Sequence, residues 1–357
     1  MIPIVVAFAQ KHRDVSGSNH PPRSVIKTRT ETFLETEMKS KTGNATFTFF
    51  RPLKRQTPIQ LAKNWSLRWI YSMYTRLFSP ADSDERKYHI SVCQIFKDEA
   101  PYLKEWIEYH LLIGIDHFYF YDNNSTDGYE KVIQPYIDRG IITLVKWPKK
   151  HSQVEAYEDC IRRFRKESDW IGFIDVDEFI VPVATKTFPE FLDKFSRKPA
   201  VLIYWRFFGS GGMIQRDLNR LVIEDFTVAS EKLYSKGKCF YNTHYEYLWD
   251  SKLNKSMFHC LWTRIHGIPV PPVDCFGRLF LKDCPATRKP IPVQLNHYAV
   301  KSFMEHREKN KKGDVYYDRP THGDSVFFGR DARCSVPDYQ IYKYLAQLKV
   351  NMGQYPH

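Results

Sequence analysis

The sequence predicts an α/β fold with a mainly parallel central sheet and helices on both faces. From Tyr88 onward, short apolar segments alternate with helix-like segments, and this alternation is typical of βαβ units. One apolar segment ends at a polar loop that starts with Asp122, and another runs into an acidic group that starts with Asp175. Ligands bind at the carboxyl ends of the strands in such sheets, so both groups are expected on one edge.

Apolar runs and helix-like segments alternate regularly in this region. Aromatic and β-branched residues fill the runs, as is typical of strands. Asp98 can cap the first helix, which is entered through Pro101 and ends at Gly114, and Gly140 ends the second helix. We therefore expect strands at 89–96, 117–121, 141–147 and 170–174, and helices at 98–114, 127–138 and 152–166.

Composition indicates a globular chain with an affinity for anions. Hydrophobic residues make up 43% of the 357 residues and aromatic residues 15%, which argues against a disordered chain. Lysine and arginine outnumber the acids 53 to 41, giving a net charge of +12. This surplus favours nucleotide phosphates, other polyanions or an anionic membrane surface. The seven cysteines include no Cys-x-x-Cys pair, so no zinc or redox motif is indicated.

An amphipathic helix is expected near residue 65. Four large apolar residues recur there at every fourth position, and basic residues lie among them. We expect this helix to pack on the protein's own core; the alternative is a helix that lies at a membrane interface. The apolar residues are Trp65, Trp69, Met73 and Leu77, and the basic ones are Lys63, Arg68 and Arg76.

We expect three parts along the chain: an N-terminal accessory segment or linker over 1–87, the α/β domain over 88–330, and a C-terminal tail over 331–357. No signal peptide or membrane-spanning segment is recognisable. A cytosolic or peripheral membrane protein is therefore expected, and a truncated Golgi-type lumenal enzyme is the alternative.

The acidic group Asp175-Val176-Asp177-Glu178 follows a short apolar strand. In an extended segment, Asp175 and Asp177 would project to one side and Val176 into the core. Two neighbouring carboxylates repel each other unless a divalent cation such as Mn²⁺ or Mg²⁺ lies between them, with phosphate oxygens as further ligands. The pattern therefore predicts a site for a metal and a diphosphate. The alternative is a solvated turn that binds no ligand.

Residues 88 to about 315 resemble glycosyltransferase family 92 and the related family 2-like glycosyltransferases. The resemblance rests on five segments that occur in the same order. They are Val92–Ala100, Glu105–His110, Tyr121–Asp127, Trp170–Phe179, which contains the Asp-x-Asp motif, and Asn296–Ser302.

This resemblance implies a GT-A fold, the Rossmann-like fold of nucleotide-diphospho-sugar transferases, over the predicted domain. It implies transfer of a hexosyl group from a nucleoside-diphosphate sugar, a UDP-sugar above all, to a hydroxyl of a glycan or glycoconjugate, with inversion and without a nucleic-acid partner. A manganese or magnesium ion would be the cofactor.

The resemblance also implies roles for single residues. Asp175 and Asp177 would address the metal, and His297 would be its third protein ligand, with His266 as the competing candidate. Lys301 and Ser302 would face the diphosphate. Gln153 and Tyr157 match the family's helix pattern and would face the donor, although packing explains them nearly as well. The residues expected to border the nucleoside are Glu99, Asp122, Asn123, Ser125 and Asp127.

Inversion needs a carboxylate that takes the proton of the acceptor hydroxyl and that does not bind the cation. Glu224 is our first candidate and Asp217 the second, with Asp225 also available; structural salt bridges would explain these acids equally well. Glu178, next to the metal acids, would orient the donor sugar or the acceptor.

Two other functions fit the same residues. A metal-dependent nucleotidyl- or phosphotransferase would use the acids and basic groups to attack phosphorus instead of carbon. A non-catalytic nucleotide- or glycan-binding protein with a degenerate transferase core would bind without turnover, although the intact Asp175, Asp177 and His297 argue against it.

Overall fold

The computed structural model describes residues 58–80, 85–249, 254, 258–280, 290–312 and 323–354, and the side chains of all of these except 58–64 and 312. The described residues all fall in one unit of the chain, Phe50–His357, and Met1–Phe49 forms the other. What the sequence predicts for residues 1–57 lies outside the described residues.

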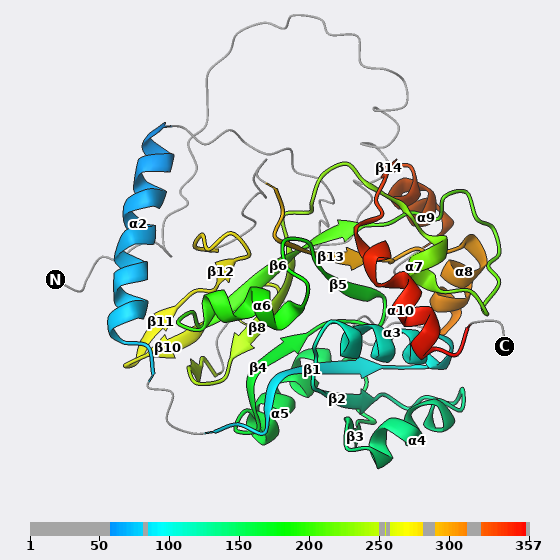
Figure 1. Ribbon diagram of the computed structural model, residues 1–357, viewed down its shortest axis with the longest axis horizontal. Coiled ribbons are helices and arrows are strands. Elements are labelled where there is room, and N and C mark those ends of the chain that lie inside the picture. Colours follow the sequence, from blue (N-terminus) through cyan, green and yellow to red (C-terminus); the bar gives the residue numbers. More distant parts are fainter. Residues whose placement is uncertain are drawn as a thin grey trace, which may run out of the picture. The chain divides into compact units, whose positions relative to one another are not determined.

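The first half of the main sheet consists of parallel strands in the order β3-β2-β1-β4 (Figure 1). These strands are almost entirely buried, which explains why the sequence shows them as continuous apolar runs. The expected strands are confirmed to within one or two residues at each end. Their bounds are β1 Tyr88–Phe96, β2 His117–Asp122, β3 Ile142–Lys146 and β4 Ser168–Phe173.

Helices cover both faces of this half-sheet. Successive side chains of β2 contact helices on opposite faces. Phe118 and Phe120 pack against Trp106 of α3 (Ala100–Leu112). Tyr119 points the other way and stacks on Phe164 at a centroid distance of 4.3 Å. Because successive side chains of a strand point to opposite faces, α3 and the helix that carries Phe164 lie on opposite faces. That helix is α5 (Gln153–Phe164), and α4 (Glu130–Asp138) connects β2 with β3.

The second half of the sheet continues beyond β4 in the order β8-β6-β13-β5. Strand β8 is antiparallel to both β4 and β6, and β5 is antiparallel to β13. Five of the eight pairings of described strands in this main sheet are parallel, so the mainly parallel sheet is confirmed. The bounds are β5 Glu178–Pro182, β6 Ala200–Phe207, β8 Gly237–Asn242, β12 Val273–Asp274, which pairs with β6, and β13 Val293–His297.

Smaller elements complete the described part of the chain. Two small sheets join β7 with β14 and β9 with β10 and β11. The strands are β7 Val228–Ser230, β9 Glu246–Tyr247, β10 Thr263–Ile265, β11 Ile268–Val270 and β14 Cys334–Pro337. The helices are α2 Pro58–Leu77, α6 Phe188–Leu192, η2 Asp193–Phe195, α7 Val222–Asp225, α8 Phe303–Lys312, α9 Asp324–Asp331, η3 Gln340–Tyr344 and α10 Leu345–Asn351.

The described part of the predicted C-terminal tail packs on the domain. Strand β14 pairs with β7, and the ring of Tyr344 meets that of Tyr109 edge-on at 5.7 Å. The ammonium group of Lys349 in α10 bonds the Glu224 carboxylate at 2.6 Å. These contacts make the tail part of the same packed body as the sheet.

Helix α2 forms as predicted but turns its apolar stripe outward. Its contacts with the domain come from other residues, since the Tyr71 hydroxyl donates to the Pro271 carbonyl (2.8 Å) and the Tyr74 hydroxyl to the Ile265 carbonyl (3.1 Å). The expectation that the stripe packs on the core is therefore wrong. No helix in the described ranges is long and apolar enough to cross a membrane.

The start of α3 also differs from the expectation. Asp98 has a positive φ of 53° and uses its carboxylate to accept the Thr126 backbone N–H at 2.7 Å. The N–H of Ala100 in the first turn is bound by Asp127 Oδ2 instead, also at 2.7 Å. Asp127, from the β2–α4 loop, thus caps the first turn of α3 in place of Asp98. Sequence spacing does not reveal this cap, because the loop and the helix are distant in sequence and meet only in the fold.

Strand β8 fits tightly between its neighbours, and we expect Gly237→Ala to destabilise the protein. An added Cβ at Gly237 would lie 1.7 Å from the carbonyl oxygen of Ile203 in β6, and backbone cannot move away as a side chain can. We predict a loss of at least about 3 kcal/mol in the free energy of unfolding, measured by chemical denaturation.

The matched control is Gly329→Ala in α9, where an added Cβ meets no atom within 4 Å. That change should leave stability the same or raise it by up to about 1 kcal/mol, because alanine favours helix. Equal stability of the two variants would contradict the placement of β8.

Candidate functional site

The acidic group lies at the sheet edge where the carboxyl ends of β1, β2 and β4 meet. These strands are parallel neighbours, so Asp122 at the end of β2 and Asp175 just after β4 share an edge, as predicted. The strand order also reverses here, because β2 and β3 lie on one side of β1 and β4 on the other. Such a switch point is where open α/β sheets bind ligands.

Residues 175–178 form a turn between β4 and β5. The Glu178 N–H donates to the Asp175 carbonyl at 3.0 Å, and Trp106 Nε1 of α3 donates to the carbonyls of Glu178 (2.9 Å) and Asp175 (3.2 Å). The expectation of an extended segment is therefore wrong. The chain must turn because β5 does not neighbour β4 but lies beyond β8, β6 and β13. As a result, Asp175 and Asp177 have different partners.

Asp175 is held by three donors. Its Oδ1 accepts hydrogen bonds from Gln153 Nε2 (3.0 Å) and the Tyr157 hydroxyl (3.2 Å), both on α5. Its Oδ2 accepts one from Lys238 Nζ of β8 at 2.9 Å. The Lys238 side chain is only 1% exposed, whereas that of Asp175 is 34% exposed. The Asp175 carboxylate is thus partly exposed to solvent, while the side chains that donate hydrogen bonds to it are buried.

Glu178 is the fully buried member of the group. Its Oε1 accepts from Trp205 Nε1 (2.7 Å), its Oε2 accepts from the Asp175 N–H (2.9 Å), and Lys238 Nζ lies 3.9 Å from Oε2. Burial raises the pKa of Glu178 well above its usual value, against the opposing effect of Lys238. Burial would lower the pKa of Lys238, but Asp175 and Glu178 raise it. In this position Glu178 stabilises the turn instead of facing a ligand.

Asp177 faces the other way, toward α8 and β13. Its Oδ2 accepts a hydrogen bond from Lys309 Nζ at 2.7 Å, and its Oδ1 lies 3.5 Å from His297 Nε2. Burial would raise the pKa of Asp177, but Lys309 and His297 hold it well below the usual value. Burial lowers the pKa of His297, which Asp177 only partly offsets. The pair is therefore a carboxylate and a neutral imidazole at pH 7.

Further cations surround Asp177. Lys301 lowers its pKa electrostatically, and Asp177 acts in turn on Arg330. Burial lowers the pKa of Lys301 and brings that of Arg330 to about 10. Lys309 remains half-exposed, with 48% of its side chain accessible. This surplus of positive charge around one carboxylate favours an additional anionic group.

Asp177 and His297 fit a divalent cation as a pair of ligands. The Asp177 carboxylate oxygen and the His297 imidazole nitrogen, 3.5 Å apart, are donors of the kinds that would hold such an ion. No group of three His, Cys, Asp or Glu side chains suited to a metal occurs in the described part of the chain. A two-ligand arrangement suits Mg²⁺ or Mn²⁺, which keep positions for water and phosphate oxygens.

The predicted diphosphate residues Lys301 and Ser302 directly precede α8. The Ser302 hydroxyl accepts the Glu305 N–H (3.3 Å), and Glu305 Oε2 accepts the Ser302 N–H (3.1 Å), which together form a capping box. Lys301 has a positive φ of 49°, and its ammonium group lies 3.9 Å from the centre of the Tyr102 ring. The capping box fixes the start of the helix that carries Lys309.

The residues predicted to border the nucleoside hold their own loop together. Asp122 accepts the Ser125 N–H (2.9 Å) and Lys146 Nζ (3.2 Å). Asn123 donates to the carbonyls of Trp147 (2.8 Å) and Lys149 (2.7 Å). Ser125 Oγ accepts the Asp98 N–H at 3.0 Å. The loop thus ties β2 to the ends of β1 and β3, and Glu99 lies beside it at the start of α3.

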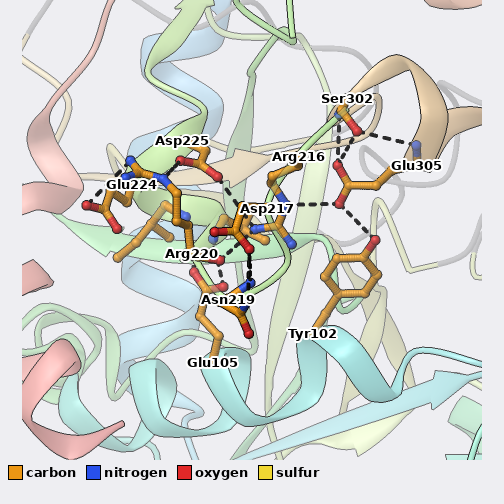
Figure 2. A network of polar contacts seen from close by, with 12 residues as sticks. Tyr102, Glu105, Arg216, Asp217, Asn219, Arg220, Glu224, Asp225, Ser302 and Glu305 are labelled. Atoms are coloured by element: carbon orange, nitrogen blue, oxygen red, sulfur yellow. Dashed lines mark hydrogen bonds and ion pairs between the residues drawn. The ribbon is translucent and has the colours of Figure 1, made fainter. Parts of the chain in front are cut away.

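The predicted base candidates lie in the polar network of Figure 2. Glu224 Oε1 accepts from Lys349 Nζ and lies 3.5 Å from Arg220. Asp217 is exposed and accepts two hydrogen bonds from Asn219. Asp225 accepts from Arg220 Nε at 2.6 Å. Arg220 joins Glu224 to Asp225, Lys349 joins Glu224 to α10, and Arg216 joins Asp225 to Glu305 of α8. Asp177 instead contacts Lys309 of α8 and His297 of β13.

Glu105, from the segment Glu105–His110 that resembles the family, binds the backbone at the start of α7. Its two carboxylate oxygens accept the N–H groups of Val222 (2.7 Å) and Ile223 (3.0 Å) at the start of α7. Burial raises the pKa of Glu105 to about 7, although these hydrogen bonds oppose the rise. The segment therefore positions α7, which carries Glu224.

The two candidate histidines are in different places. His297 pairs in the sheet with Glu178 and lies beside Asp177. His266 is exposed in the turn between β10 and β11, where its ring meets Phe78 next to α2. The structure brings His297, and not His266, to the acidic group.

Sequence reasoning missed the two lysines that pair with the acids. Lys238 carried a usable signal, because it is a lone charge in the otherwise uncharged strand segment 237–242, and lysine is almost never fully buried unless paired. Lys309 carried none, since it lies in the run Glu305–Lys312, where most residues are charged.

We predict that Lys238→Met destabilises the protein by about 3–5 kcal/mol, because it leaves the Asp175 and Glu178 carboxylates without their cation. Without Lys238, the folded-state pKa of Glu178 rises further, because the charge that opposes the rise is lost. The loss of stability should therefore be largest at alkaline pH and shrink as pH falls and Glu178 becomes neutral. Urea denaturation of wild type and variant at several pH values measures it.

Lys311→Met is the matched control. Lys311 pairs with Glu308, but both side chains are more than half exposed, so its loss should change stability by less than about 1 kcal/mol at every pH. A Lys238→Met variant that behaves like this control would contradict the role given to Lys238.

Comparison with known proteins assigns the chain to a family. The model of glycosyltransferase family 92 matches residues 86–263. A glycosyltransferase family 92 protein of Oryza sativa subsp. japonica is 38% identical over 118 residues, which are 32% of this chain and 20% of the relative. A galactan beta-1,4-galactosyltransferase of Arabidopsis thaliana is 33% identical over 108 residues, covering 27% and 22%. The chain thus spans about a fifth of the length of these relatives.

Among solved structures, S. aureus TarS 1–349 in complex with UDP aligns with 48% of this chain and 53% of its own, at 14% identity and a TM-score of 0.31. This TM-score is too low to support an argument about the fold. The evidence for the α/β fold is the sheet described above. The family match spans β1 to β10, including the acidic turn and Lys238. The chain therefore belongs to glycosyltransferase family 92.

Proposed function

We propose that this protein transfers a hexosyl group from a nucleoside-diphosphate sugar to a hydroxyl of a glycan, with Asp177 and His297 holding a manganese or magnesium ion. The observation that carries this proposal is the Asp177 carboxylate, 3.5 Å from His297 and paired with Lys309, in the turn that follows β4. The cation would supply Lewis acidity to the leaving nucleoside diphosphate.

The lysines around Asp177 support a diphosphate beside it. Lys309 is half-exposed and able to move, while Lys301 is fixed between the α8 cap and the Tyr102 ring. In this proposal both ammonium groups contact phosphate oxygens and stabilise the charge that develops on the leaving group. Asp175, oriented by Gln153 and Tyr157, addresses the donor from the other side of the turn.

The Arabidopsis thaliana relative is a galactosyltransferase by name, so we propose UDP-galactose as the first donor to test. In this proposal the loop of Asp122, Asn123, Ser125 and Asp127, with Glu99 beside it, borders the nucleoside. The bond from the anomeric carbon to phosphate breaks as the acceptor oxygen attacks.

Inversion would require a base, and we propose Glu224 ahead of Asp217. Glu224 is anchored by Lys349 and Arg220 on a helix that the buried Glu105 positions. In this proposal it takes the proton of the acceptor hydroxyl as the new glycosidic bond forms.

We predict that Asp177→Asn lowers sugar transfer by at least about 100-fold, because the amide removes the negative charge that attracts the cation. The assay measures release of nucleoside diphosphate and the glycosylated product by mass spectrometry, with UDP-galactose and other donors, with Mn²⁺ and with excess chelator. Asp324→Asn, which removes the carboxylate of an exposed pair with Arg307, is the control and should retain activity.

Full transfer by Asp177→Asn at ordinary Mn²⁺ concentrations, or by the wild type in excess chelator, would overturn the metal role. Release of pyrophosphate without sugar transfer would instead identify a nucleotidyltransferase. Thermal melting of each variant must show an intact fold, because Asp177 also pairs with Lys309 and His297.

We also predict opposite effects of Lys309→Met on the two ligands. Because Lys309 occupies Asp177 Oδ2, its removal frees a carboxylate oxygen and removes a nearby positive charge, so Mn²⁺ should bind several times more tightly. UDP should bind more weakly, since a phosphate contact is lost. Calorimetric titrations with Mn²⁺ alone, and with UDP in the presence of Mn²⁺, measure both effects. The same change at the exposed Lys311 should alter neither, and parallel changes in both affinities would refute this role.

A further inference from the structure

Helix α2 is the blue helix of Figure 1. It carries a row of large apolar side chains that are exposed to solvent. Trp65 is 69% exposed, Trp69 59%, Met73 41% and Leu77 67%, and Ile70 beside them is 54% exposed. Residues four apart lie above one another on a helix, so these five side chains form one continuous ridge. A contiguous exposed ridge of this kind indicates an interaction surface.

The ridge is exposed because the helix is attached by its other side. Tyr71 and Thr75, also four residues apart, are buried. The Tyr71 hydroxyl donates to the Pro271 carbonyl, and Lys198 Nζ donates to Thr75 Oγ1 at 2.9 Å and lies over the Tyr71 ring. Rotating α2 to bury the ridge would break these contacts, so the outward direction of the ridge is fixed.

The charge of α2 favours an anionic surface as its partner. The helix contains Lys63, Arg68 and Arg76 and no acidic residue, and the whole chain carries +12. Both arginines are exposed. A second copy of this chain would place one basic helix against another, which like charges oppose. Anionic lipid headgroups attract such a helix, and tryptophan favours the membrane–water interface.

We propose that α2 binds the surface of an anionic membrane, with Trp65 and Trp69 inserted at the level of the headgroups and Arg76, on the same side of the helix, near lipid phosphates. The helix lies in the interface and does not span it. Its attachment through Tyr71, Tyr74 and Thr75 then holds the α/β domain at the membrane surface. This proposal is independent of the reaction that the domain catalyses.

The test is binding of the full chain to vesicles of phosphatidylcholine with and without phosphatidylserine, followed by co-sedimentation and tryptophan fluorescence. We expect binding to the anionic vesicles, a blue shift of the fluorescence, and weaker binding at high salt. The double variant Trp65→Glu, Trp69→Glu should abolish binding without lowering the melting temperature. Val350→Glu, at an apolar residue of α10 that is 52% exposed, is the matched control and should bind normally.

A second variant keeps the test decisive if the tryptophan changes disturb folding. Arg68→Gln with Arg76→Gln alters only charge and should weaken binding to the anionic vesicles by about tenfold or more. Absence of binding by the wild type, or equal loss in Val350→Glu, would overturn the proposal. So would a dimer in vesicle-free solution that the Trp65→Glu, Trp69→Glu variant dissociates, since a second copy would then be the partner.

Discussion

The candidate site depends on one buried charge, the ammonium group of Lys238. It lies on β8, the antiparallel strand between β4 and β6, and reaches Asp175 at 2.9 Å and Glu178 at 3.9 Å. The turn brings together the fully buried Glu178 and the partly exposed Asp175, and a cation between them offsets their mutual repulsion and the burial of Glu178. Lys238 therefore allows the chain to leave β4 through an acidic turn instead of an apolar one.

This pairing has a consequence for the chemistry that the site can perform. Since Lys238, Gln153 and Tyr157 occupy Asp175, the second acid, Asp177, is the one directed to His297 and to the lysines of α8. One turn thus separates a carboxylate anchored by buried donors from a carboxylate paired with the half-exposed Lys309. A cation bound by Asp177 and His297 alone needs ligands from outside the protein, and a diphosphate is suited to supply them.

Sequence patterns predicted the fold well because the parallel strands are buried on both faces and therefore appear as apolar runs. They also placed Asp122 and Asp175 on one edge, since strand direction fixes that edge. What they missed are partners brought by distant segments: Asp127 in place of Asp98 at the start of α3, Lys238 and Lys309 at the acids, and the turn that separates Asp175 from Asp177. The direction of α2 was missed because an apolar stripe has the same spacing whether it faces a core or a membrane.

The most direct measurement of the central claim is the affinity of the wild-type chain for Mn²⁺, determined by electron paramagnetic resonance with and without UDP. Because Asp177 and His297 offer two ligands, we predict weak binding of Mn²⁺ alone and much tighter binding once UDP supplies phosphate oxygens, with both affinities lowered in His297→Ala. Tight Mn²⁺ binding that neither UDP nor the loss of His297 changes would contradict the account.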